Sequence, residues 1–535
     1  MPTDSLTTPQ HELAETLLPA TDLQPQSIDE VLALPSFSSV LRAAERRERT
    51  PFAALAAEWQ DAIVERRLRQ LVAICRLNPV WRQRIDAALP AGEWDGIEAF
   101  QAIPITDKET FREMFTDKRP GMVVPIERGG FEIVASGGTS SGLPSETVYP
   151  LDELQETYAW AGEFIGRHLI PRFMPEAGPK WVATTLADYQ MWSSGTMVGG
   201  VLQKIPGVNY VGAGPMSREV FQWMMNYPGP KAIMGITQSV ALLPKFAAGL
   251  SPAARASFRI AMYGSGLLTP KAREELATEY PNVQVLSYFA ATQAETIGLQ
   301  LDARSPILTA VPGLHLIEIV DEEGRAVPEG AEGELVVTRL FGHAAPCLRY
   351  KVGDRVIRRS NFASGGLNAR QFEYVGRSGD FMHIGDTQYS AQRAIEAAMA
   401  EFKSRQLLDI AAVASDYQFV IDRAARELHL VVATPAAAGL HAALAARLGP
   451  EGTAPVLVAA LIKSLSVFNS LEANEASLWR SGYTFGLKIV EPHSPVLHRT
   501  AVGKVPLVYD KPAIAPGLAN GHASSASGGG AAHHR

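Results

Sequence analysis

Alternating apolar and polar segments divide the middle of the chain into strands and helices. Short apolar runs predict buried strands at residues 181–186, 232–236, 259–263 and 283–288. The segments around them have helical periodicity, at residues 151–169, 217–226, 239–248 and 270–279. Strand and helix in alternation favour a mainly parallel sheet covered by helices, so we expect an α/β fold.

The pattern differs on either side of this middle part. Residues 58–77 predict an amphipathic helix with Cys75 on its apolar face, which we interpret as a core residue. Residues 315–320 and 333–339 predict paired strands of a β-rich subdomain, and Tyr350–Asp354 is expected in a polar turn. The expected parts are a poorly ordered N-terminus (1–35), a large N-terminal domain (36–378), a small α+β C-terminal domain (379–515) and a disordered tail (516–535).

The composition excludes several classes of protein. The chain has 535 residues, 46% hydrophobic and 20% charged, which is typical of a globular protein with more than one core. A net charge of −7 gives no basic footprint for nucleic acid. Two cysteines support neither a disulfide framework nor a cysteine zinc site. Because no signal peptide or bilayer-spanning run is visible, we expect a cytoplasmic protein without membrane partners.

A loop rich in glycine and hydroxyl residues, Ser136–Ser145, follows an apolar run that predicts a strand. Its glycines free the backbone to fold tightly, and its N–H and hydroxyl groups can converge on an oxyanion such as phosphate. The alternative is a flexible surface loop. The loop is neither a Walker P-loop, since no Gly-Lys-Ser/Thr closes it, nor the dinucleotide fingerprint.

Further motifs follow this loop in a fixed order: Tyr288–Gln293, Gly333–Thr338, Tyr350–Asp354, Gly376–Asp380 and Arg499–Lys504. With the glycine loop, they resemble the motifs of the adenylate-forming superfamily of acyl-CoA synthetases, adenylation domains and luciferases. The resemblance is strongest to the phenylacetate–CoA ligase-like branch and covers about residues 60–510. It implies ATP-dependent activation of a carboxylic acid as an acyl-adenylate, with Mg²⁺ as cofactor and coenzyme A as the expected acceptor.

The resemblance also implies a role for individual residues. The ATP phosphates would lie on the glycine loop, at Ser136, Gly138, Thr139, Ser140, Ser141 and Gly142. Adenine and ribose would be bound by Gly264, Ser265, Gly266, Tyr288, Phe289, Thr292, Asp354 and Arg377. Lys504 and Thr139 would be catalytic, with Lys504 cancelling the charge that builds between the α-phosphate and the carboxylate. Asp380 would be the hinge of a mobile C-terminal domain.

Some positions depart from the family pattern. The magnesium-binding glutamate is replaced by Gln293, a poorer ligand for a hard cation. Glu295 is one candidate substitute, and the alternative is that ATP itself holds most of the Mg²⁺ ligands. Ser145 stands where many members have lysine, and Gly385–Asp386 lacks the usual Arg-Gly pair. The last departure bears on the transfer step more than on adenylation.

The acid is expected to bind near residues 181–200, 232–238 and 264–267. Tyr189, Met191 and Trp192, with Gly235, are the candidate substrate residues, and their aromatic character suits an aryl or arylalkyl acid. Plain core packing is an equal alternative for the three large side chains.

The acceptor stays open at this stage. Besides coenzyme A, an amine or the thiol of a separate carrier protein would fit, because no carrier domain is fused to the chain. A third interpretation is a non-catalytic relative that binds nucleotide or a partner, which Gln293 favours and the retained Asp354 and Lys504 disfavour. The sequence is also compatible with a homodimer.

Overall fold

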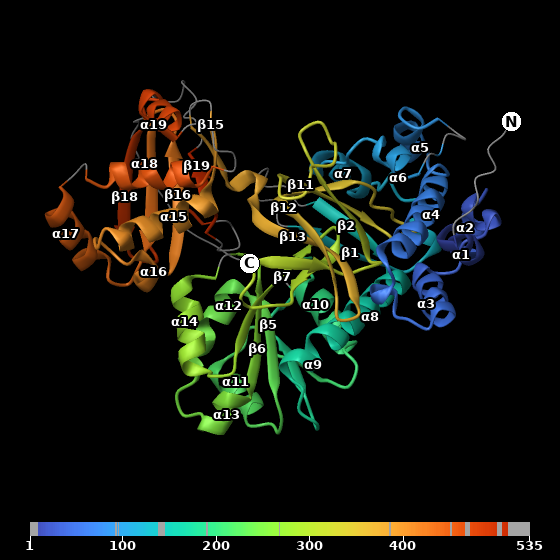
Figure 1. The fold of residues 1–535 in the computed structure, drawn as a ribbon, viewed down its shortest axis with the longest axis horizontal. Helices are drawn as coiled ribbons and strands as arrows, with labels where there is room; N and C mark the ends of the chain where they lie inside the picture. Colours follow the sequence, from blue (N-terminus) through green and yellow to red (C-terminus); the bar gives the residue numbers. More distant parts are fainter. Residues whose placement is uncertain are drawn as a thin grey trace, which may run out of the picture.

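The computed structural model describes residues 9–90, 94, 96–136, 145–188, 191–266, 268–384, 387–449, 452–465, 471–499 and 505–511. Within these ranges the chain forms a large N-terminal domain and a small C-terminal domain, which occupies one end of the molecule in Figure 1.

The large domain is organised around one mixed sheet. Its described strands have the order β10-β11-β12-β13-β9-β8-β7-β6-β5-β3-β4. The strands of the parallel part are β3 (Trp181–Thr184), β4 (Asn209–Gly212), β5 (Lys231–Ile236), β6 (Phe258–Gly264) and β7 (Gln284–Ala291). The antiparallel part is formed by β8 (Glu295–Gln300), β9 (Ile307–Ala310), β10 (His315–Val320), β11 (Glu332–Arg339), β12 (Tyr350–Ser364) and β13 (Leu367–Arg377). The predicted α/β architecture with a β-rich subdomain is confirmed.

Helices cover the parallel part, as Figure 1 shows. They are α8 (Leu151–His168), α9 (Ile170–Phe173), α10 (Ser194–Gln203), α11 (Arg218–Met225), α12 (Thr237–Leu242), α13 (Pro252–Ser257) and α14 (Pro270–Glu279). Side-chain caps fix where several of them begin. Ser217, Ser251 and Thr269 each accept a hydrogen bond from a backbone N–H in the first turn.

A helical layer at the N-terminus packs on the side of the large domain away from the small domain (Figure 1). It contains α1 (Pro9–Leu17), α2 (Ile28–Ala33), α3 (Phe37–Glu48), α4 (Ala57–Cys75), α5 (Pro79–Asp86) and α6 (Gly96–Gln101). The expectation of a poorly ordered segment 1–35 is therefore wrong for its described part. Its scattered leucines, among them Leu13, Leu18 and Leu23, are buried in the main core. The next helix, α7 (Lys108–Phe115), lies against β2 (Ser145–Pro150) and β12, nearer the middle of the molecule (Figure 1).

The hairpin of β1 (Phe131–Ser136) and β2 (Ser145–Pro150) lies beside α7 and α8. Two other local predictions need correction. Tyr350–Asp354 belongs to strand β12 instead of a turn, because β11 and β13 pair with it on both sides. The second concerns residues 187–216, for which no element is predicted from the sequence although helix α10 and strand β4 lie there.

The small domain has its own core, made by residues between Met382 and Ile489. Its sheet has the order β18-β17-β16-β19, from β16 (Asp416–Asp422), β17 (Glu427–Ala433), β18 (Thr484–Val490) and β19 (Val508–Asp510), beside a hairpin of β14 (Phe381–Ile384) and β15 (Thr387–Ser390). The helices are α15 (Ala391–Ser404), α16 (Ile410–Val413), α17 (Ala437–Leu448), α18 (Ala454–Lys463) and α19 (Leu471–Arg480).

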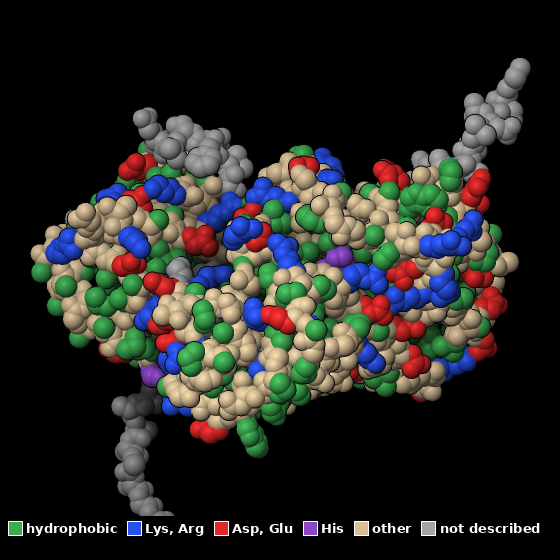
Figure 2. Space-filling model, turned by 60° about the horizontal axis from the view of Figure 1, so that its bottom comes forward, with side chains coloured by type: hydrophobic (Ala, Val, Ile, Leu, Met, Phe, Trp, Pro, Cys, Tyr) green, Lys and Arg blue, Asp and Glu red, His purple; other side chains and the backbone are tan. Residues whose placement is uncertain are grey.

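Both cysteines are buried in the large domain. Cys75 and Cys347 are 0% and 1% exposed, and burial raises the pKa of both thiols, that of Cys347 to about 12. Cys75 is the core residue that the helix pattern predicts. None of the described helices has the length and hydrophobicity needed to cross a membrane. Figure 2 shows acidic and basic side chains interspersed over the face in view.

Candidate functional site

The predicted ligand residues gather where the sheet changes from parallel to antiparallel. Ile236 of β5 pairs with Gly264 at the end of β6, and Tyr263 pairs with Ser287 of β7. The carboxyl ends of neighbouring parallel strands share one edge, which is where open α/β sheets bind ligands. Gly235, Gly264–Gly266 and Tyr288–Thr292 therefore face one region.

The turn after β6 is held in a tight shape. Thr237 donates through Oγ1 to the carbonyl oxygens of Gly264 and Gly266, at 3.0 and 2.9 Å. Ser265 has a φ of 66°, in the left-handed region. A Cβ on Gly264 would lie 2.7 Å from the Tyr288 ring. The glycine thus makes room for Tyr288, which is 8% exposed, in addition to the predicted close approach of the backbone to a base.

Phe289, the other candidate for stacking on adenine, leans on two aromatic rings. Its centroid lies 5.9 Å from that of Phe372 and 5.5 Å from that of Tyr374. The loop after it is anchored by the Tyr149 hydroxyl, which donates to the carbonyl oxygen of Thr292 at 2.6 Å. Which aromatic ring receives the base stays a prediction.

Glu295 and Gln293, the metal candidates, are both buried. Glu295 has a φ of 47°; its carboxylate lies 3.8 Å from Arg339 Nη1 and 3.6 Å from His315 Nε2. Arg339 in turn sits over the Tyr149 ring, at 4.4 Å. The charge of Glu295 is thus already compensated. The described residues contain no group of three or more His, Cys, Asp or Glu side chains placed to hold a metal ion.

Asp354, the candidate ribose acceptor, lies near the start of β12. It is 5% exposed and pairs across strands with Arg377. The Tyr374 hydroxyl donates to Asp354 Oδ1 at 3.3 Å, and Arg377 Nε lies 3.8 Å from the same oxygen. Burial raises the pKa of Asp354 to about 6, although Arg377 and Tyr374 oppose the shift. A buried acceptor with a cation beside it suits a polar, anionic ligand.

The predicted hinge lies in the short helix η5 (Ser378–Asp380), between β13 and the small domain. Ser378 donates to both carboxylate oxygens of Glu334, at 3.0 and 2.8 Å. Burial raises the pKa of Asp380, and Arg377 opposes that shift. The predicted hinge thus begins beside Asp354, the candidate ribose acceptor.

Ion pairs connect the two domains near this hinge. Glu332 of β11 accepts from Arg355 Nε at 2.7 Å, and Arg393 of helix α15 lies 3.6 Å from its other oxygen. Glu332 is the shared acceptor of a strand of the large domain and a helix of the small one.

Several predicted residues lie outside the described part of the chain: Gly138, Thr139, Ser140, Ser141, Gly142, Tyr189 and Lys504, together with Gly385 and Asp386. Ser136 ends β1 and pairs with Ser145, which begins β2, so the two ends of the glycine loop are held together. The phosphate-binding and catalytic roles of these residues stay predictions.

The candidate acid residues are not grouped as expected. Met191 is 49% exposed, and its carbonyl oxygen accepts from the N–H of Ala135 at 2.8 Å. A Cβ on Gly235 would lie 2.2 Å from Thr185 Oγ1, so the absence of a side chain at this position allows Thr185, which follows β3, to pack against β5. Neither Met191 nor Trp192 lines the cavity described next.

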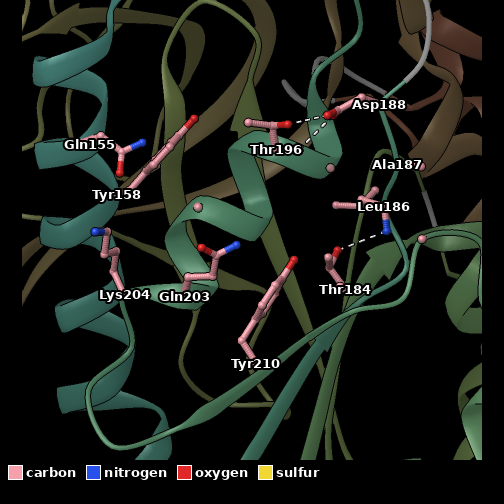
Figure 3. Close-up of a pocket in the computed structure, with 14 residues that line it drawn as sticks. Gln155, Tyr158, Thr184, Leu186, Ala187, Asp188, Thr196, Gln203, Lys204 and Tyr210 are labelled. Atoms are coloured by element: carbon pink, nitrogen blue, oxygen red, sulfur yellow. Dashed lines mark hydrogen bonds between the residues drawn. The ribbon is translucent and has the colours of Figure 1, made fainter.

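A cavity of about 470 Å³ lies between α8, α10 and the ends of β3 and β4 (Figure 3). Its lining includes Gln155, Tyr158, Thr184, Leu186, Asp188, Thr196, Gln203, Lys204 and Tyr210. Thr184, Leu186, Asp188 and Thr196 fall in the segment 181–200 where the acid is expected, although none of them is named as a candidate. Gln155, Tyr158, Gln203, Lys204 and Tyr210 lie outside the segments predicted to bind the acid. The cluster Gly195, Gly199 and Gly200 in a helix was the available signal, since glycines in a helix interior often mark close packing.

Comparison with known proteins was made on sequence and on structure. No protein-family model matches the sequence, and no curated protein matches it. Solved structures do match. 2-Hydroxyisobutyryl-CoA ligase in the postadenylation state, in complex with 2-HIB-AMP, has a TM-score of 0.63 at 18% identity, over 86% of this chain and 91% of that chain. The acyl acid amido synthetase AtGH3.15 in complex with 2,4-DB has a TM-score of 0.55 at 14% identity, over 86% and 91%.

This chain has the fold of the adenylate-forming enzymes. The expected resemblance is confirmed at the level of the fold. An open conformation of the same CoA ligase, with 2-HIB-AMP and CoA, has a lower TM-score, 0.52 at 16% identity, over 85% of this chain and 92% of that chain.

Proposed function

We propose that this protein activates a carboxylic acid with ATP, releases pyrophosphate, and transfers the acyl group to coenzyme A. The observation that carries the proposal is the buried Asp354, with Tyr374 and Arg377 against it. The Tyr374 ring in turn packs on Phe289, a candidate for stacking on adenine. This arrangement supports a nucleotide site with a charged acceptor for the ribose hydroxyls.

In the proposed first step, a carboxylate oxygen of the acid attacks the α-phosphorus of ATP. The new C–O–P linkage forms as the bond to pyrophosphate breaks, so no proton is needed at the reacting centre. The barrier is then mainly a matter of positioning and charge. Asp354 would fix the ribose, Arg377 would add a cation on the open side, and Lys504 would reach the reacting atoms from the small domain.

Magnesium is placed on the nucleotide in this proposal. Gln293 is neutral, and Glu295 is already paired with Arg339 and His315. Mg²⁺ usually keeps several waters and takes few protein carboxylates, so ATP phosphate oxygens can supply its ligands. No step of the proposed reaction depends on a protein-held metal.

Transfer to an amine is the second candidate. It is favoured by the likeness to an acyl acid amido synthetase, with a TM-score of 0.55 over 86% of this chain. A carrier-protein thiol is a third acceptor of the same adenylate. An aromatic acid stays part of the proposal, from the resemblance to phenylacetate–CoA ligases.

Acid-dependent ATP–pyrophosphate exchange tests the first step. A panel of aryl and alkyl acids should give exchange with at least one acid, and Asp354→Ala should reduce it. Absence of exchange with every acid, in the presence of Mg²⁺, would favour a non-catalytic relative. Once an acid is known, coenzyme A, hydroxylamine and amino acids compared as acceptors separate thioester from amide formation.

A further inference from the structure

The cavity between α8 and α10 has both polar and apolar groups at its described walls. It lies at the carboxyl ends of β3 and β4, through Thr184, Leu186 and Gly212. Its volume of about 470 Å³ is in the range of small-molecule sites. Tyr158 and Tyr210 project into it from opposite walls, and their hydroxyls point toward the end with Asp188 and Thr196 (Figure 3).

The glycines of α10 seat both tyrosines. A Cβ on Gly200 would lie 2.4 Å from the Tyr158 ring, and one on Gly199 would lie 2.6 Å from the Tyr210 hydroxyl. Real side chains do not approach so closely, so any larger residue would push the rings away. The local sequence therefore fixes two aromatic rings and leaves the space between them open.

Most polar groups of this cavity already have partners. Asp188 accepts hydrogen bonds from the N–H of Thr196, at 2.9 Å, and from its hydroxyl. The Tyr210 hydroxyl is paired with Gln203. The Tyr158 hydroxyl differs. Tyr158 is 1% exposed and, among the described residues, its oxygen has no hydrogen-bond partner.

The Tyr158 hydroxyl is set up as a donor. Burial raises its pKa, and the nearby carboxylates Glu132, Glu295 and Asp188 raise it further, so the group keeps its proton. Buried hydroxyls in folded proteins nearly always have a partner, and those without one often mark a site of function. A ligand oxygen in the cavity would supply the missing acceptor.

The cavity is within reach of the proposed adenylation site. Strand β3 pairs with β5, and β5 pairs with β6, so two strand spacings separate the cavity wall from Gly264. At about 4.8 Å for each spacing, this is about 10 Å, the length of a small acid. Gly235, which admits Thr185, lies between them.

We propose that this cavity holds the part of the acid remote from its carboxyl group, and that this part carries an oxygen which accepts a hydrogen bond from Tyr158. The substrate class is an acid with a hydroxyl or carbonyl oxygen at the far end, such as a hydroxyaryl or hydroxyalkyl acid. This inference rests on the proposed function, because it names the substrate of the same site.

The test compares acids that differ by one oxygen. The pairs are 4-hydroxyphenylacetate with phenylacetate and 6-hydroxyhexanoate with hexanoate. In ATP–pyrophosphate exchange, the hydroxylated member of at least one pair should have a kcat/KM about tenfold or more above its partner, because one hydrogen bond in a closed site discriminates by that order. In Tyr158→Phe the preference should disappear, because kcat/KM falls for the hydroxylated acid and stays unchanged for its partner. Tyr227→Phe, at a distant and partly exposed tyrosine, should keep it.

Direct titration of the same acids, without ATP, separates this inference from the proposed reaction. If titration shows a Tyr158-dependent preference but no acid supports exchange, the proposed reaction is rejected and the proposed binding site is retained. Exchange without a preference, or a preference that survives in Tyr158→Phe, overturns the inference alone. Failure in both assays overturns both. Removal of an unpaired hydroxyl should leave the melting temperature at or above that of the wild type, so misfolding does not confound the result.

Discussion

Asp354, the proposed ribose acceptor, lies in an unfavourable environment for its charge. Its native pKa of about 6 lies above the usual value of 3.8. Between these two pH values the folded protein holds a proton that the unfolded chain releases, so stability falls as pH rises. The cost is absent below about pH 4 and complete above about pH 6, where it reaches roughly 3 kcal/mol.

Asp354→Asn should therefore stabilise the free protein and weaken its nucleotide binding. The free energy of unfolding in urea should rise by up to roughly 3 kcal/mol at pH 8 and by only roughly 1 kcal/mol at pH 4.5, because the cost grows between the two pKa values. The KM for ATP should rise about ten- to a hundredfold at pH 8, through loss of a charged acceptor. Equal stability of variant and wild type at pH 8, or an unchanged KM, would contradict this account.

Glu295 is expected to stabilise the fold without binding metal. Glu295→Gln leaves Arg339 buried without its carboxylate, and loss of one member of a buried pair costs roughly 3 kcal/mol. A lower midpoint in urea should accompany an unchanged Mg²⁺ concentration for half-maximal exchange. Gln293→Glu, which adds a charged oxygen, is the matched comparison and should lower that concentration. A sharply raised Mg²⁺ requirement in Glu295→Gln would instead make Glu295 a metal ligand.

The sequence predicts some of these residues and not others, for a physical reason. Asp354 and Arg377 belong to local motifs whose spacing is visible in the chain, and strand pairing brings them together. Tyr158 has no such motif. Its position depends on Gly200, from a different helix, and its missing partner becomes visible only in three dimensions.

At the scale of elements, the packing of β6 against β7 depends on one glycine. Gly264→Ala would bring a Cβ to within 2.7 Å of the Tyr288 ring, so one of the two must move. We expect a loss of about 1–3 kcal/mol in unfolding free energy and weaker ATP binding. Gly439→Ala is a suitable control, since its Cβ would meet nothing within 4 Å. If Tyr288→Leu in the Gly264→Ala background fails to restore stability, the clash is not the cause.

Periodicity was informative for the covered parallel strands and less so elsewhere. Buried strands flanked by helices have long apolar runs, which the sequence displays directly. Tyr350–Asp354 looked like a turn because Gly353 and Asp354 favour turns, yet Gly353, with a φ of 84°, lies within β12. The neighbouring strands determine that conformation, and they come from distant parts of the chain.

At the scale of the whole molecule, activity is expected to require the small domain. Lys504→Ala should reduce the rate of adenylation by a hundredfold or so while ATP binding stays within a few-fold. An interaction made only in the transition state lowers kcat without changing ground-state affinity. Single-turnover pyrophosphate release and equilibrium ATP titration measure the two quantities. A wild-type rate in this variant would remove Lys504 from the mechanism.

Because both native thiols are buried, the protein is expected not to react with cysteine reagents. Maleimides and peroxide attack thiolates that solvent can reach, and Cys75 and Cys347 are neither ionised nor accessible. Dyes could therefore be attached at cysteines introduced at two exposed helical positions, Trp223 in the large domain and Glu475 in the small domain, with the native pair left in place. Energy transfer between those dyes would show, molecule by molecule, whether the distance between the two domains changes when ATP and an acid are added.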